Sequence, residues 1–116
     1  MTDRFRITLA QLNATVGDFA GNAALARSAW EEGRANGAQL VALPEMFITG
    51  YNTQDLVVKP AFHNAAIRAI EALAKDCADG PALAIGGPAV VDSALHNGYY
   101  ILKKGQIQTC VLKHEL

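Results

Sequence analysis

The stretch that decides the fold is Gln39-Leu40-Val41-Ala42-Leu43-Pro44-Glu45, an apolar run that ends in a proline and a glutamate. The run predicts a short buried β-strand, and Pro44 should end it because proline cannot donate a hydrogen bond to a sheet. Glu45 is therefore expected at a strand end, between Leu43 and Met46. An apolar setting would strip water from the carboxylate, which favours general-base chemistry; a solvated loop glutamate is the alternative.

The residues before this strand predict a strand-helix-strand unit. Residues 5–12 alternate well enough for a strand, with Phe5, Ile7 and Leu9 on one face. Residues 20–36 have the spacing of an amphipathic helix, and Asn36-Gly37 should end it. The two strands are expected to run parallel, because a helical crossover joins them.

The residues after Glu45 predict a second helix, a third strand and a hairpin. The helix is expected over residues 60–77, and the strand over 82–88. Gly86-Gly87-Pro88 is interpreted as a turn at the strand end, since it lacks the lysine of a phosphate loop. Residues 99–102 and 107–113 should form the hairpin. The expected fold is α/β, a mixed sheet with both helices on one face.

The chain ends at residues 113–116, directly after a predicted strand. We interpret residues 1–116 as the N-terminal part of a longer domain, the remainder of which is absent from this chain. The second face of the sheet would then expose apolar side chains. Self-association could cover that face, so a homo-oligomer is expected.

Composition narrows the classes of function. Hydrophobic residues make up 51% and charged residues 18% of 116 residues, as in one globular domain. A net charge of -1 gives no basic surface for nucleic acid or anionic membranes. No apolar run approaches the ~18 residues that cross a bilayer, and the N-terminus lacks the apolar segment of a signal peptide. We expect a cytoplasmic protein.

The cysteines and histidines do not predict a metal site. His63, His96 and His114 stand apart in the sequence, without metal-ligand spacing. Cys77 and Cys110 are interpreted as buried, reduced thiols, with a catalytic role as the less favoured alternative.

Lys113 is the expected partner of Glu45. It ends the last predicted strand, and active sites in such sheets gather at the carboxyl ends of strands. A lysine there would hold the glutamate ionised and stabilise developing negative charge. Cys110 lies an odd number of residues before Lys113 and should therefore point to the opposite face.

The ordered set of motifs resembles the N-terminal half of the nitrilase (carbon-nitrogen hydrolase) superfamily. The motifs are residues 7–13, Leu43-Pro44-Glu45 with Gly50-Tyr51, and Leu112-Lys113-His114-Glu115-Leu116. Within the superfamily, Asp55-Leu56 and Lys59-Pro60-Ala61-Phe62 are similar to the glutaminase domain of glutamine-dependent NAD synthetases.

This resemblance implies an αββα sandwich with a Glu-Lys-Cys triad that hydrolyses a carboxamide. Glu45 matches the general base and Lys113 the catalytic lysine, while the cysteine falls beyond Leu116. Tyr51 matches a tyrosine of the glutamine pocket; a ring that merely covers the sheet end is the alternative. No cofactor is expected in this segment, but ATP and magnesium are implied for the full-length synthetase, which amidates deamido-NAD.

Three functions stay open on the sequence. The first is the glutaminase portion of an NAD synthetase, inactive as this chain alone because the nucleophile is missing. The second is a free-standing amidase that acts on another small amide. The third is a non-catalytic binding or assembly module. The Tyr51–Phe62 stretch favours the first.

Overall fold

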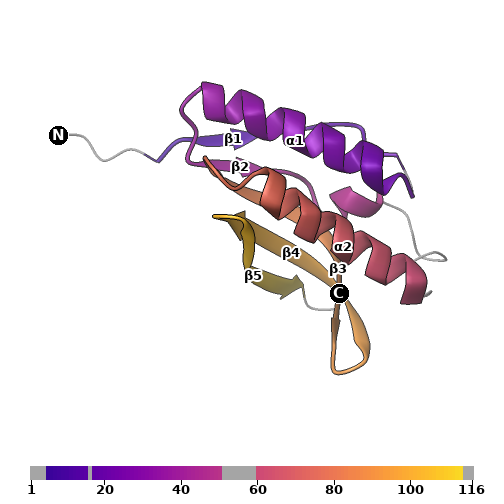
Figure 1. Cartoon of the computed structure of the whole chain (residues 1–116). Coiled ribbons are helices and arrows are strands. Elements are labelled where there is room, and N and C mark those ends of the chain that lie inside the picture. Colours follow the sequence, from indigo (N-terminus) through magenta and orange to yellow (C-terminus); the bar gives the residue numbers. More distant parts are fainter. Residues whose placement is uncertain (1–4, 16, 51–59, 114–116) are drawn as a thin grey trace.

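A mixed sheet with the strand order β1-β2-β3-β4-β5 forms the frame of the molecule (Figure 1). The computed structural model describes residues 5–15, 17–50 and 60–113. Its elements are β1 (Ile7–Leu9), α1 (Phe19–Ala35), β2 (Leu40–Ala42), the short 3-10 helix η1 (Phe47–Thr49), α2 (Pro60–Asp76), β3 (Ala82–Val91), β4 (Ala94–Lys103) and β5 (Gln106–Lys113).

The predicted strand-helix-strand unit is confirmed. β1 pairs parallel with β2, and β2 pairs parallel with β3, while β4 and β5 add antiparallel strands. Helix α1 begins where the Asp18 carboxylate accepts a 2.9 Å hydrogen bond from the Gly21 amide, and Gly37 follows its end with a positive φ of 78°. β1 is shorter than expected, because β2 offers three residues for parallel pairing.

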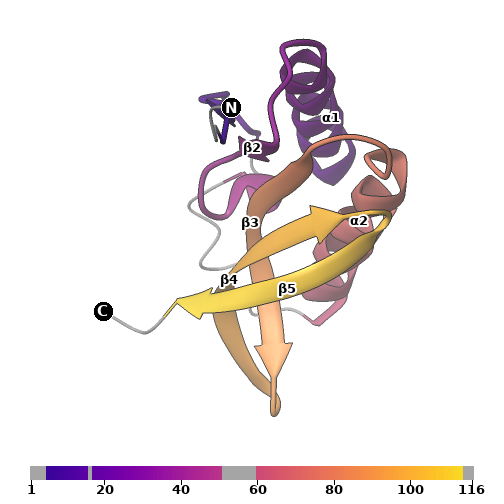
Figure 2. The ribbon, with the colours of Figure 1, turned by 90° about the vertical axis from the view of Figure 1, so that its left-hand side faces the viewer.

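Both helices cover one face of the sheet, as expected (Figure 2). The buried core lies between them and the strands, and it includes Trp30 of α1, Ile70 of α2 and Ile85 of β3. The Trp30 indole donates a 2.8 Å hydrogen bond to the Pro81 carbonyl, which ties α1 to the start of β3. Part of the opposite face exposes apolar side chains, among them Leu9 and Val111, at 77% and 59%.

The interpretation of Gly86-Gly87-Pro88 as a strand-end turn is wrong. These residues lie inside β3, which pairs with β4 from Leu83 to Val91. β2 pairs with β3 only as far as Ala84, so Pro88 interrupts no ladder on that side. The chain instead reverses at Asp92 and Ser93, whose φ angles of 52° and 66° match a two-residue hairpin turn.

The predicted last hairpin is confirmed, although β4 begins earlier than expected, at Ala94. It turns at Lys104 and Gly105, both with positive φ. No helix in the described part of the chain is long and apolar enough to cross a membrane.

Candidate active site at the end of strand β2

Glu45 lies in a tight turn directly after β2, as predicted. The turn stays attached to β3: the Leu43 amide donates to the Ala84 carbonyl at 2.8 Å, and the Gly86 amide donates to the Pro44 carbonyl at 3.3 Å. Met46 then adopts a left-handed conformation with φ 51° and ψ 25°, and η1 begins at the next residue. The backbone of Glu45 is thus held between a strand end and a short helix.

Helix α1 and the loop before it hold η1 and the adjoining turn in place. Phe47 and Ile48 of η1 are fully buried. The side-chain amide of buried Asn22 donates to the Ile48 carbonyl at 3.1 Å, and the Gly17 amide donates to the Thr49 carbonyl at 3.0 Å. Burial and hydrogen bonds together fix the position of η1, and therefore of the residues just before it.

Gly86 is a site residue that the sequence analysis missed. A Cβ atom at this position would lie 2.6 Å from both the carbonyl carbon and the Cα of Glu45, and closer still to the Met46 nitrogen. Only a glycine allows the turn to lie this close to β3. The adjacent pair Gly86-Gly87 was a visible signal, but the residue that packs against it is 41 positions earlier in the chain.

A pocket of about 450 Å³ opens beside the turn. Its lining comes from the turn, from β4 and from β5: Leu43, Pro44, Glu45, Asn97, Gly98, Tyr99 and Val111. The lining is mostly apolar, with Glu45, Asn97 and Tyr99 as polar side chains. Such a pocket suits a small, partly apolar ligand with a polar end.

Tyr99 is the second site residue that the sequence analysis missed. Its hydroxyl donates a 2.7 Å hydrogen bond to the Leu43 carbonyl, across the sheet from β4 to the end of β2. Burial raises the pKa of the Tyr99 phenol, and the negative charge of Glu45 raises it further. The phenol therefore stays protonated at neutral pH and remains a hydrogen-bond donor.

The expected poor solvation of Glu45 is wrong for this structure. Glu45 is exposed, although Leu43 is buried and Met46 is half-buried. The backbone bends at Pro44 and at the left-handed Met46, and Glu45 lines the pocket between them.

Lys113 lies at the end of β5, where its backbone pairs with that of Asn97. Asn97 lines the same pocket as Glu45, so the two predicted catalytic residues belong to neighbouring parts of one sheet edge. Contact between their side chains stays a prediction. Tyr51 lies outside the described residues.

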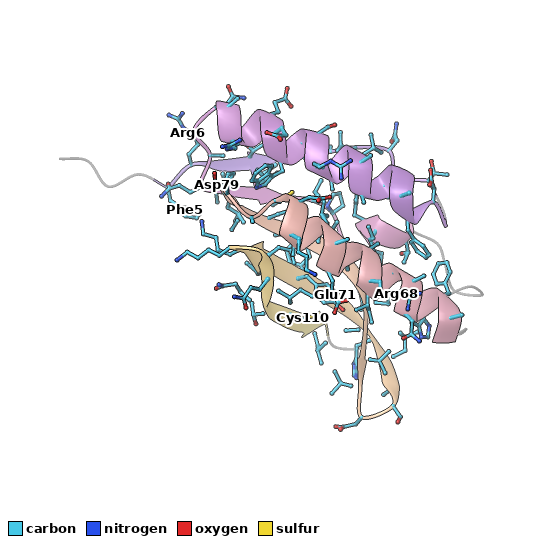
Figure 3. All side chains as sticks on the ribbon, viewed as in Figure 1. Phe5, Arg6, Arg68, Glu71, Asp79 and Cys110 are labelled. Carbon is cyan, nitrogen blue, oxygen red and sulfur yellow. The ribbon has the colours of Figure 1, made fainter. Side chains whose placement is uncertain are left out.

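The two cysteines do not complete the site. Burial raises the pKa of the Cys77 thiol to about 12, and that thiol lies in the core. Cys110, labelled on β5 in Figure 3, pairs with Tyr100 and packs against the core on the helix side of the sheet. Burial raises its pKa as well. Neither thiol is a ready nucleophile, but only Cys77 is buried as expected, since Cys110 is half-buried.

The resemblance implies ATP and magnesium for the full-length enzyme and not for this segment. Within residues 5–15, 17–50 and 60–113, no three His, Cys, Asp or Glu side chains form a group that could hold a metal ion.

Comparisons with known proteins agree with this architecture. The chain is 60% identical over all 116 residues to a glutamine-dependent NAD(+) synthetase of Rhodobacter capsulatus, and spans 21% of that protein. A crystal structure of a glutamine-dependent NAD(+) synthetase from Cytophaga hutchinsonii superposes with a TM-score of 0.89 at 27% identity, over 97% of this chain and 19% of that one.

An amidase from Nesterenkonia sp. shares the fold, with a TM-score of 0.75 at 24% identity, over 97% of this chain and 43% of the amidase. The chain thus spans about a fifth of the curated relatives that it matches. The family model described as carbon-nitrogen hydrolase matches residues 6–114. Because this match covers nearly the whole chain, the protein belongs to the carbon-nitrogen hydrolase family.

Proposed function

We propose that this chain forms the first part of the glutaminase domain of a glutamine-dependent NAD synthetase. The observation that carries the proposal is the 60% identity to such a synthetase over all 116 residues, a span that includes both Glu45 and Lys113. The pocket beside Glu45 supports it, because an apolar wall with a few polar groups suits the side chain of glutamine.

In this proposal Glu45 is the general base. It takes the proton from a cysteine thiol located beyond Leu116, and the thiolate sulfur attacks the carboxamide carbon of glutamine. Lys113 stabilises the negative oxygen of the tetrahedral species. The C–N bond then breaks and the proton held by Glu45 leaves with ammonia. Water, deprotonated by Glu45, cleaves the thioester to glutamate and restores the thiol.

The remaining features of the proposal concern the longer protein. ATP and magnesium would act in a separate part of it, where ammonia amidates deamido-NAD. Tyr51 would contact the glutamine substrate. We further expect a cytoplasmic homo-oligomer that binds neither nucleic acid nor membranes.

The test uses the longer protein that contains this chain and measures release of ammonia and glutamate from glutamine. Glu45→Gln and Lys113→Ala should each lower glutaminase turnover by ~10² or more, the scale of a general base or an oxyanion-stabilising group. Glu32→Gln and Lys75→Ala are matched controls on exposed helix positions and should leave turnover unchanged.

Turnover within threefold of the parent for either site variant would contradict the assigned role. A parent that hydrolyses other small amides but not glutamine would favour the free-standing amidase. A parent without any amidase activity would favour the binding or assembly module. The 116-residue chain by itself should release no glutamate.

A further inference from the structure

We propose that Tyr99 is a positioning residue for Glu45: its hydroxyl holds the Leu43 carbonyl, and so fixes the turn that presents the carboxylate to the pocket. The proposal rests on the role of Glu45 as the base in the proposed function. It adds a residue that does not react with the substrate but sets where the reacting group lies.

The sheet geometry gives Tyr99 this reach. Tyr99 on β4 pairs with Gly86 on β3, and Gly86 is the residue against which the Glu45 backbone lies. The phenol therefore lies beside the same turn, and its hydroxyl meets the Leu43 carbonyl at 2.7 Å. Tyr99 on β4 therefore reaches past β3 and bonds the chain where it leaves β2.

The Tyr99 hydroxyl bonds the Leu43 carbonyl, whereas the pairing with β3 uses the Leu43 amide. The Leu43 amide is bonded to the Ala84 carbonyl, so Tyr99 supplies the partner for the other side of the same residue. Glu45 is two residues further on. Loss of the phenolic donor would free the carbonyl and let the turn shift towards the open pocket, where Glu45 is exposed.

The charge of Glu45 is close enough to act on the phenol. After burial, it is the second cause of the raised pKa of Tyr99. A protonated phenol next to a carboxylate is a stable donor, whereas a phenolate would be repelled by it. The phenol therefore remains a hydrogen-bond donor at neutral pH.

The neighbouring tyrosine provides a matched control. Tyr100 also donates from its hydroxyl to a backbone carbonyl, that of Pro88, at 2.5 Å. It is buried on the helix side of the sheet, away from the Glu45 turn. Tyr99→Phe and Tyr100→Phe therefore remove the same kind of bond, and only the first of them touches the turn.

The experiment compares these variants with the parent in the longer protein, by steady-state glutaminase kinetics. Tyr99→Phe should lower kcat roughly tenfold, the equivalent of one hydrogen bond, with KM within about twofold. Tyr100→Phe should keep kcat within about twofold. With kcat expressed per folded enzyme molecule, a purely structural role would lower the amount of folded enzyme but leave kcat unchanged in both variants.

A second measurement uses the 116-residue chain and does not depend on activity. With tyrosine labelled with ¹³C at Cζ, an NMR titration should show that Glu45→Gln lowers the pKa of Tyr99 but leaves that of Tyr100 unchanged. Backbone amide shifts of Leu43 and Glu45 should change more in Tyr99→Phe than in Tyr100→Phe.

The outcomes separate the two proposals. If Glu45→Gln is inactive while Tyr99→Phe keeps the kcat of Tyr100→Phe, Glu45 remains the base and the positioning role is wrong. If Glu45→Gln retains full activity, the proposed function fails. If the parent is inactive, the NMR titration decides: a Tyr99 pKa that ignores Glu45→Gln, with unchanged amide shifts at the turn in Tyr99→Phe, overturns the inference.

Discussion

Gly86→Ala is the substitution that tests most directly how the Glu45 turn is held. The new Cβ would lie 2.6 Å from the Cα and the carbonyl carbon of Glu45, whereas ordinary contact begins at 3.4 Å. These are backbone atoms, which cannot rotate away as a side chain can. The turn would therefore have to retreat from β3 by roughly 1 Å.

Two opposing contributions set the size of the effect. Overpacking of this kind costs about 1–3 kcal/mol. Replacing glycine by alanine restricts the unfolded chain and returns about 0.4–1 kcal/mol. We expect Gly86→Ala to lower the free energy of unfolding by about 1–2 kcal/mol. In the longer protein, a displacement of roughly 1 Å at the base should lower glutaminase turnover by ~10².

The assay is urea unfolding of the 116-residue chain, followed by the fluorescence of Trp30. This is the only tryptophan of the sequence, and it is 2% exposed in the core. Gly87→Ala is the comparison variant, because its Cβ would meet side-chain atoms, the Cδ1 of Ile70 at 2.7 Å and the Cγ2 of Ile48 at 2.9 Å, and not the backbone of the turn. The reasoning would be refuted if Gly86→Ala were as stable as the parent, or no less stable and active than Gly87→Ala.

Two further predictions concern the same chain. Asn22→Ala should lower the free energy of unfolding in urea by about 2–3 kcal/mol, because it removes hydrogen bonds to Ile48 and Thr15 from a buried side chain. The control Arg27→Ala breaks a half-exposed ion pair with Asp76 and should cost no more than about 1 kcal/mol. An equal cost for both variants would contradict the anchoring role of Asn22. Burial raises the pKa of Cys77 from 9.0 to about 12, so its contribution to stability should be complete below pH 9 and decline between pH 9 and 12. The urea midpoint should fall over that range, and a Cys77→Ala variant with an equally steep fall would rule out this thiol as a cause.

Local patterns predicted the part of the fold that depends on neighbours in sequence. The strand-helix-strand unit followed from the apolar run before Pro44 and the helical spacing before Asn36. The last hairpin followed from Gly105 between two alternating segments. The β3–β4 hairpin was missed, because Asp92-Ser93 is not one of the usual glycine-containing turn pairs.

The site residues likewise fall into those that the sequence predicted and those that it did not. The place of Glu45 at a strand end was predictable, because Pro44 ends the strand within the same stretch of sequence. Tyr99 and Gly86 were not, since each acts on the turn from a different strand. Their roles depend on strand order and register, and one sequence without its pairing partners does not specify these.

A general base at Glu45 has to meet two requirements, a fixed position and low hydration, and the exposure of Glu45 shows that this structure meets only the first. Its position is encoded within this chain, by Gly86 below the turn, Asn22 at η1 and the Tyr99 hydroxyl. The low hydration that favours a general base is absent in this structure, where Glu45 is exposed and lines the pocket. Variants of the positioning residues should therefore alter the turn in the 116-residue chain itself.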